Sequence, residues 1–124
     1  MAPVAGMLQL TLQWQNEINV CDTHIAGLTS QRLSLVRQTS TMAAERQDEM
    51  SQISQDDPQY LEKKKDVELK YDAQDKELAY LEEEIDEEMN TWQTRRKMAE
   101  QYVDAFQSGL QDGLKNSFSP YPQS

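Results

Sequence analysis

The sequence predicts an all-α protein built from two long amphipathic helices, arranged either as a helical hairpin or as a kinked coiled-coil rod. A single helix-breaking segment, Gln55-Asp56-Asp57-Pro58, separates two long stretches that hold few residues able to stop a helix. The hydrophobic content is 37%, the charged content 27% and the mean hydropathy −0.84. This composition is too polar for a large compact core, but it suits helices whose narrow apolar stripe is covered by a second helix. We expect one helical domain over residues 1–124.

The first helix is predicted over residues 7–54, after a flexible or extended arm over 1–6 that contains Pro3 and Gly6. Apolar residues then recur in steps of three and four, which is the spacing of one helix face. Gly27 and several serines and threonines weaken this helix by up to about 1 kcal/mol each. The stripe comprises Trp14, Ile18, Cys21, Ile25 and Leu28, continues at Leu35 and Met42, and is widened by Leu33 and Val36.

The second helix is predicted over residues 58–115, after a turn at 55–57 and before a tail at 116–124. Asp57 suits the N-cap, because its carboxylate accepts free backbone N–H groups, and Pro58 suits the first helical position. The repeat is close to a heptad, with an offset around Met89 that implies local unwinding of the supercoil. The expected stripe is Leu61, Val67, Tyr71, Leu78, Leu81, Ile85, Met89, Trp92, Arg96, Ala99, Val103, Phe106, Leu110 and Leu114.

The formal charge of −10 is concentrated in the second half of the chain, where residues 56–124 hold 17 acidic and 9 basic side chains. This balance disfavours binding to a phosphate backbone, and neither helix shows a basic stripe. No segment approaches the roughly 20 apolar residues that cross a bilayer, and the first residues lack the pattern of a cleavable signal peptide. We expect synthesis as a soluble cytoplasmic protein, and any export by a route that needs no cleaved signal.

The sequence indicates no enzyme, cofactor or metal site. Cys21 and His24 are three residues apart, but zinc needs three or four ligands and no second such pair exists, so Cys21 is more simply a small core residue. The acidic run Glu82–Glu88 spreads its carboxylates around the helix and is expected to be a solvated face. The flanking basic blocks, residues 63–65 and 95–97, could set register between neighbouring copies.

Long apolar stripes on a polar chain favour self-association, most simply with further copies of the same chain. The tail residues Phe118 to Tyr121, or the arm before Met7, are expected to make contacts between subunits. The residues expected to carry self-association are Trp14, Ile18, Ile25, Leu28, Leu35, Leu78, Leu81, Ile85, Met89, Trp92, Val103, Phe106, Leu110 and Phe118.

Two short motifs carry a family resemblance: Asp57-Pro58-Gln59-Tyr60-Leu61, and the helix end Leu114-Lys115-Asn116-Ser117-Phe118. They resemble the second half of short bacterial helical proteins of unassigned role, and the first half of the chain, from Leu10-Thr11 through Gln31-Arg32-Leu33-Ser34-Leu35, is compatible with the same group. The architecture is similar to that of type III secretion needle and inner-rod subunits, which are small helical hairpins with a proline-containing turn. The resemblance implies export without a cleaved signal and polymerisation into a hollow helical filament.

The favoured function is therefore that of a non-enzymatic structural protein that self-associates through long helices, as the subunit of a secretion-type or other tubular filament. One alternative is a soluble coiled-coil adaptor or chaperone that covers a helix of another protein. A second is an acidic inhibitor that mimics nucleic acid and depends on the run Glu82–Glu88.

Overall fold

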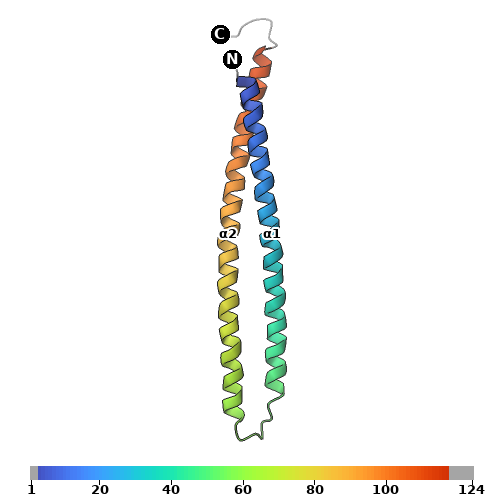
Figure 1. Cartoon of the computed structure of the whole chain (residues 1–124), viewed down its shortest axis with the longest axis vertical. Coiled ribbons are helices and arrows are strands. Elements are labelled where there is room, and N and C mark those ends of the chain that lie inside the picture. The colour runs from blue at the N-terminus through green and yellow to red at the C-terminus, as the bar shows by residue number, and fades with distance from the viewer. Residues whose placement is uncertain (1–2, 118–124) are drawn as a thin grey trace. The chain divides into compact units, whose positions relative to one another are not determined.

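The protein is an α-helical hairpin. The computed structural model describes residues 3–117, which form two helices, α1 (Pro3–Ser51) and α2 (Tyr60–Ser117), and no strand. The chain reverses between the helices, so that α1 and α2 run antiparallel (Figure 1). This confirms the predicted fold class, and it decides between the two predicted arrangements in favour of the hairpin.

Helix α1 begins at Pro3, four residues before the expected start, so residues 3–6 are helical instead of part of an arm. Proline is tolerated in the first turn, where its missing N–H is not needed. Contacts with α2 explain why the helix also includes Gly6. A Cβ atom built on Gly113 would lie 3.2 Å from Val4 Cγ2, and one built on Gly109 would lie 2.9 Å from Met7 Sδ. Because these two glycines have no Cβ atom, Val4 and Met7 can pack closely against α2.

The turn contains a side-chain N-cap at Asp57. Its Oδ1 accepts a hydrogen bond from the Gln59 N–H at 2.8 Å, and its carbonyl accepts one from the Tyr60 N–H at 3.0 Å. Pro58 has no N–H and fits between them. The Lys63 ammonium donates to Asp57 Oδ2 at 2.6 Å, so the same carboxylate also anchors the next turn. Regular helix ends at Ser51 and resumes at Tyr60, which makes the connection longer than the expected 55–57.

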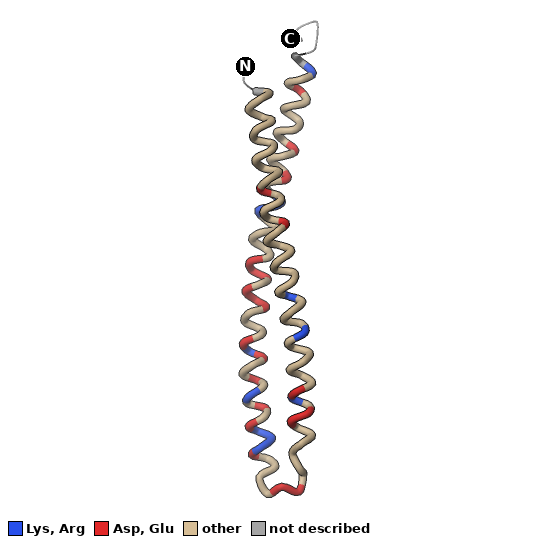
Figure 2. The backbone as a smooth tube through the Cα atoms, turned by 45° about the vertical axis from the view of Figure 1, so that its right-hand side comes forward, with Lys and Arg blue, Asp and Glu red and all other residues tan. Residues whose placement is uncertain are grey.

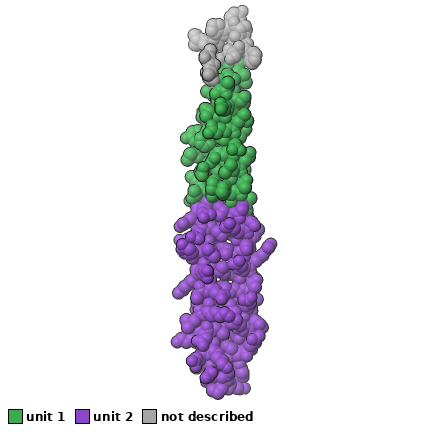
Figure 3. All heavy atoms as spheres, in the orientation of Figure 1, with its two compact units in different colours: residues 1–26, 89–124 green, residues 27–88 purple. Residues whose placement is uncertain are grey.

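The chain divides into two compact units (Figure 3). Unit 1 comprises residues 1–26 and 89–124, and unit 2 comprises residues 27–88. In each unit a segment of α1 lies beside a segment of α2, as two views of the backbone show (Figures 1 and 2). The boundary in α2 coincides with the offset in its heptad repeat. Leu81 and Trp92 are eleven residues apart, four more than one heptad, with Ile85 and Met89 as the inward positions between them.

Unit 1 has an unbroken seam of inward side chains. The inward positions follow steps of three and four on both helices, and each is buried or half-buried. Thr11 is a buried polar member, and its hydroxyl donates to the Met7 carbonyl at 2.7 Å. The seam consists of Val4, Met7, Thr11, Trp14, Ile18, Cys21 and Ile25 from α1, and Met89, Trp92, Arg96, Ala99, Val103, Phe106, Leu110 and Gly113 from α2.

Unit 2 has a small buried core and is crossed by ion pairs between its two helix segments. Its buried hydrophobic side chains are Leu28, Met42, Tyr71 and Ile85. The inward positions between them are mixed: Leu35 and Leu78 are half-buried and apolar, whereas Arg46 and Gln74 are half-buried and polar. Three cations of the unit reach across to carboxylates of the facing helix. The pairs are Arg32 with Asp86, Arg46 with Asp72 and Asp75, and Lys70 with Glu49.

Four expected stripe residues lie outside the seam. Leu33 and Val36 are 55% and 60% exposed, and Leu61 and Leu114 are 77% and 41% exposed. Tyr60 and Gly113 occupy the inward register next to the latter two. The reason is geometric: a hairpin covers only one side of each helix, so apolar residues beside the a and d positions remain in solvent.

Candidate protein-protein interface

Stacked aromatic rings hold the two helix segments of unit 1 together. Trp14 of α1 stacks on Tyr102 of α2, with ring centroids 4.6 Å apart, and Tyr102 continues to Phe106 at 6.2 Å. Further along, His24 stacks on Trp92 at 3.8 Å, and the Arg95 guanidinium lies 4.9 Å from the centre of the Trp92 ring. Such pairs stabilise by about 0.5–1.5 kcal/mol each beyond the area they bury.

A groove opens on one flank of this aromatic seam. It has a volume of about 250 Å³ and is lined by residues of both helices: Gln13, Trp14, Glu17, Arg95 and Met98. Helical spacing places further side chains in line with the lining, because residues three and four apart share a face. Leu10 and Val20 flank Gln13 and Glu17 on α1, and Tyr102 follows Met98 on α2.

We call this surface the Trp14 face, and define it as Leu10, Gln13, Trp14, Glu17 and Val20 of α1 with Arg95, Met98 and Tyr102 of α2. Its apolar members are substantially exposed: Met98 at 48%, Tyr102 at 42%, and Leu10 and Val20 at 38% each. The two charged members neutralise each other, since an Arg95 nitrogen lies 2.7 Å from Glu17 Oε1. The Trp14 face is therefore an apolar surface with no net charge.

Charge is distributed very unequally between the units. Unit 1 holds 5 acidic and 4 basic residues, whereas unit 2 holds 17 acidic and 8 basic residues. Residues 1–16 contain no Asp, Glu, Lys or Arg. The backbone coloured by charge shows this end of α1 without a charged residue and the acidic residues gathered along the part of α2 in unit 2 (Figure 2). Unit 2 thus carries nearly all of the net charge.

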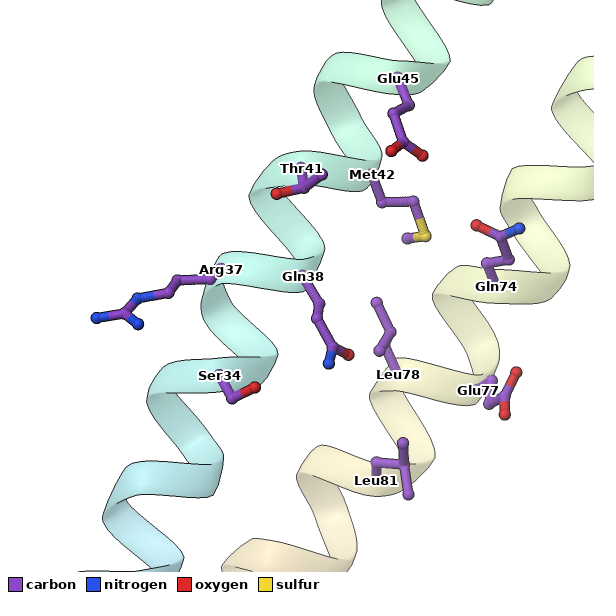
Figure 4. A pocket seen from close by; sticks show the side chains of 10 residues that line it. All are labelled: Ser34, Arg37, Gln38, Thr41, Met42, Glu45, Gln74, Glu77, Leu78 and Leu81. Atoms are coloured by element: carbon purple, nitrogen blue, oxygen red, sulfur yellow. The ribbon is translucent and has the colours of Figure 1, made fainter.

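Unit 2 has grooves of its own on both flanks of its seam. One of them, of about 480 Å³, receives Met42 and Leu78, while Arg37 on its rim points away from the facing helix (Figure 4). A second groove of about 350 Å³ is lined mainly by apolar side chains and aliphatic stems, among them Leu35, Val36, Ala43 and Leu78. Both grooves are open, and both have charged residues at their edges.

The acidic run on α2 is a solvated surface in the structure. All six of its carboxylate side chains are exposed, whereas Ile85 is buried on the seam. Asp86 pairs with Arg32 across unit 2. A hydrogen bond to Glu84, together with its negative charge, raises the pKa of the Tyr80 hydroxyl above its ordinary value. The carboxylates point in different directions, as expected for the exposed part of a coiled coil.

Cys21 and His24 are not brought together as a metal site. Cys21 is fully buried on the seam, where burial raises the pKa of its thiol, and His24 lies flat against Trp92. Within residues 3–117, no group of three or more His, Cys, Asp or Glu side chains is placed to hold a metal ion. Nor does any helix in this part of the chain combine the length and the apolar character needed to span a bilayer.

The residues expected to carry self-association mostly lie between α1 and α2 of the same chain. Leu28, Ile85, Met89 and Val103 are buried there, and Leu81 is 37% exposed. Phe118 and the rest of the expected tail contact, 118–121, lie outside the described residues. The half-buried members are Trp14, Ile18, Ile25, Leu35, Leu78, Trp92, Phe106 and Leu110.

Sequence reasoning missed the Trp14 face, although a signal for it exists. Leu10, Gln13, Glu17 and Val20 follow steps of three, four and three beside the main stripe, and Arg95, Met98 and Tyr102 do the same on α2. What the sequence could not supply is the pairing that places these two rows on the same flank.

The comparisons with known proteins identify no relative. No protein-family model, no curated protein sequence and no solved structure matches this chain.

Proposed function

We propose that this chain is a non-enzymatic structural protein that self-associates through its helices. The observation that carries this proposal is the Trp14 face, an exposed apolar surface without net charge on a chain whose net charge is −10. Burying apolar surface stabilises an assembly by about 25 cal/mol per Å². Within residues 3–117 the hairpin has no third element over this face, so a further chain can supply the cover.

The proposed contact between copies lies on the flank of the seam, whereas the sequence predicted it on the seam residues themselves. Trp92 and Phe106 were expected to bind other copies, but they pack inside unit 1, where Trp92 stacks on His24. Substituting them would damage the hairpin as well as any assembly. Substituting an exposed member of the Trp14 face, above all Met98, tests assembly alone, because the seam inside the hairpin stays intact.

The test is the mass distribution of the purified protein by light scattering over a wide range of concentration, with negative-stain images of the largest fraction. We expect the mean mass to rise with concentration, and regular tubes or rings would extend the proposal to a filament subunit. A monomer mass at every concentration, with the circular dichroism of a folded helical protein, would refute self-association.

A second candidate function is an adaptor that covers a helix of another protein. The apolar groove of about 350 Å³ in unit 2, with the 60% exposed Val36 on its wall, supports it. An amphipathic helix can dock in such a groove through side chains spaced three and four residues apart. The adaptor predicts a stable one-to-one complex with a different protein that is lost in Val36→Glu and kept in Met98→Glu.

A further inference from the structure

The Trp14 face combines features that make it complementary to itself. Its apolar side chains surround one acidic and one basic group, Glu17 and Arg95, which lie side by side. A twofold contact requires that a surface match its own copy, because each residue i that meets residue j is repeated as j meeting i. A face with one charge of each sign can meet this requirement, since the Glu17 of each copy can approach the Arg95 of the other.

We propose that the Trp14 face binds the Trp14 face of a second copy about a twofold axis, and that the product is a four-helix contact confined to unit 1. This inference rests on the proposed self-association and specifies its partner, its surface and its symmetry. It adds that Glu17 and Arg95 pair between copies as well as within one chain.

The difference in net charge between the two units favours a dimer contact in unit 1. Two copies that met through unit 2 would bring together surfaces with a net charge of −9 each, whereas the surfaces of unit 1 carry −1 each. Like charges within a Debye length, about 8 Å at physiological salt, repel one another. The acidic run of unit 2 therefore acts against association there, and the flank of unit 1, which has no net charge, is favoured.

The side of unit 1 that carries the Trp14 face is close to the size of a stable contact. Residues 3–26 of α1 span about 36 Å at 1.5 Å per residue, and two helices side by side are about 20 Å wide. One side of unit 1 therefore offers roughly 700 Å², and the Trp14 face, about 15 Å long from Leu10 to Val20, forms roughly 300 Å² at its centre. A standard protein-protein interface buries about 800 Å² on each partner, so this one side is close to sufficient.

The first experiment compares sedimentation velocity of the full chain with that of Met98→Glu and Leu61→Glu. The two variants add the same charge at exposed leucine- or methionine-sized side chains, one on the Trp14 face and one in unit 2. We expect Met98→Glu to weaken the dimer by about 30-fold or more, as substitution of a central interface residue does. Leu61→Glu should dimerise like the natural chain, and both variants should keep its helical circular dichroism.

The second experiment tests the twofold pairing by charge exchange. Glu17→Arg places two cations on the face, and Arg95→Glu places two carboxylates there. Each variant alone should dimerise at least about 10-fold more weakly than the natural chain, since like charges at an interface disfavour the wrong partner. An equimolar mixture should form a heterodimer, because each face then meets its opposite.

The outcomes separate the two proposals. A natural chain that is monomeric throughout refutes self-association and the twofold contact together. If Met98→Glu dimerises as well as the natural chain, the twofold contact is overturned and self-association stands. The same conclusion follows if Glu17→Arg and Arg95→Glu form no heterodimer on mixing. Continued growth of mass without a plateau also overturns it, because a twofold contact closes at two copies.

Discussion

Trp14 stacks on Tyr102 across unit 1, with ring centroids 4.6 Å apart and an angle of 21° between the planes. Tyr102 is 42% exposed and Trp14 is half-buried, so the pair belongs both to the seam of the hairpin and to the Trp14 face. One pair of rings thus links the stability of unit 1 to the surface that is proposed to bind a second copy.

The stack should be measurable as a coupling energy in a double-mutant cycle. We expect Trp14→Ala and Tyr102→Ala each to lower the free energy of unfolding, by roughly 1–3 kcal/mol, because each removes a large partly buried ring. The double variant should lose about 0.5–1.5 kcal/mol less than the sum of the two single losses, which is the contribution of the ring pair. Urea unfolding followed by circular dichroism gives all three values, and a coupling of zero would show that the rings do not interact.

Glycine substitutions should separate helix propensity from close packing. At Gly27 an added Cβ meets nothing within 4 Å, so Gly27→Ala should stabilise the protein by about 0.5–1 kcal/mol. At Gly113 the added Cβ would lie 3.2 Å from Val4, whose β-branched side chain has few alternative rotamers. We therefore expect Gly113→Ala to stabilise less than Gly27→Ala or to destabilise, and equal gains in the melting temperature would contradict the close contact.

The N-cap at the turn should make stability depend on pH in the acid range. The hydrogen bond from Lys63, and then that from the Gln59 N–H, hold the pKa of Asp57 below its ordinary value. A lowered folded-state pKa means that the stabilisation is present above the unfolded-state value and is lost as the pH falls through the folded-state value. The difference in Tm between the natural chain and Asp57→Asn should thus be largest near neutral pH and shrink toward pH 2. A difference that stays constant over this range would assign the effect to something other than the carboxylate.

Cys21 should report the opening of unit 1. Its side chain is fully buried, and burial raises the pKa of its thiol, so both access and thiolate formation oppose reaction. We expect the native protein to react with a thiol reagent at least about 100-fold more slowly than the protein in denaturant. Trp14→Ala should accelerate labelling because it loosens the seam around Cys21. Equally fast labelling of the native and the denatured chain would contradict the burial.

Self-association should strengthen with salt. Each copy carries a net charge of −10, and this long-range repulsion is screened as ionic strength rises, whereas the apolar contact is not weakened. We expect the dimer dissociation constant to fall between 0.05 and 0.5 M sodium chloride. A contact formed mainly by ion pairs would show the opposite trend in the same titration.

The sequence was sufficient for the presence of two helices and for the position of the turn between them, because these depend on local features. It did not predict the bounds, since the connection covers residues 52–59 instead of 55–57 and α2 ends at Ser117 instead of residue 115. The steps of three and four predict the helices, and Asp57-Pro58 predicts where the second one starts. The start of α1 was predicted too late, because Pro3 and Gly6 together suggested an extended arm, although proline is tolerated in the first turn of a helix. It depends on contacts of Val4 and Met7 with glycines more than 100 residues away in the chain.

The residues of the Trp14 face were harder to predict from the sequence than the residues of the seam. An apolar residue on a long helix can lie on the covered side or beside it, and the difference is one position in the heptad. Leu61 was expected to be covered, but Tyr60 has the inward register and Leu61 is exposed. Met98 and Tyr102 could be placed beside Gln13 and Glu17 only after the pairing of α1 and α2 was known.

The eleven-residue interval from Leu81 to Trp92 makes the hairpin modular. On either side of it α2 follows regular heptads, so the parts of α2 in unit 1 and unit 2 are two differently phased lengths of the same repeat. A matched insertion or deletion of seven residues in both helices of one unit would change that unit's length and leave the other in register. The aromatic unit, with a net charge of −1, and the acidic unit, with a net charge of −9, can therefore vary in length separately over the course of divergence or design.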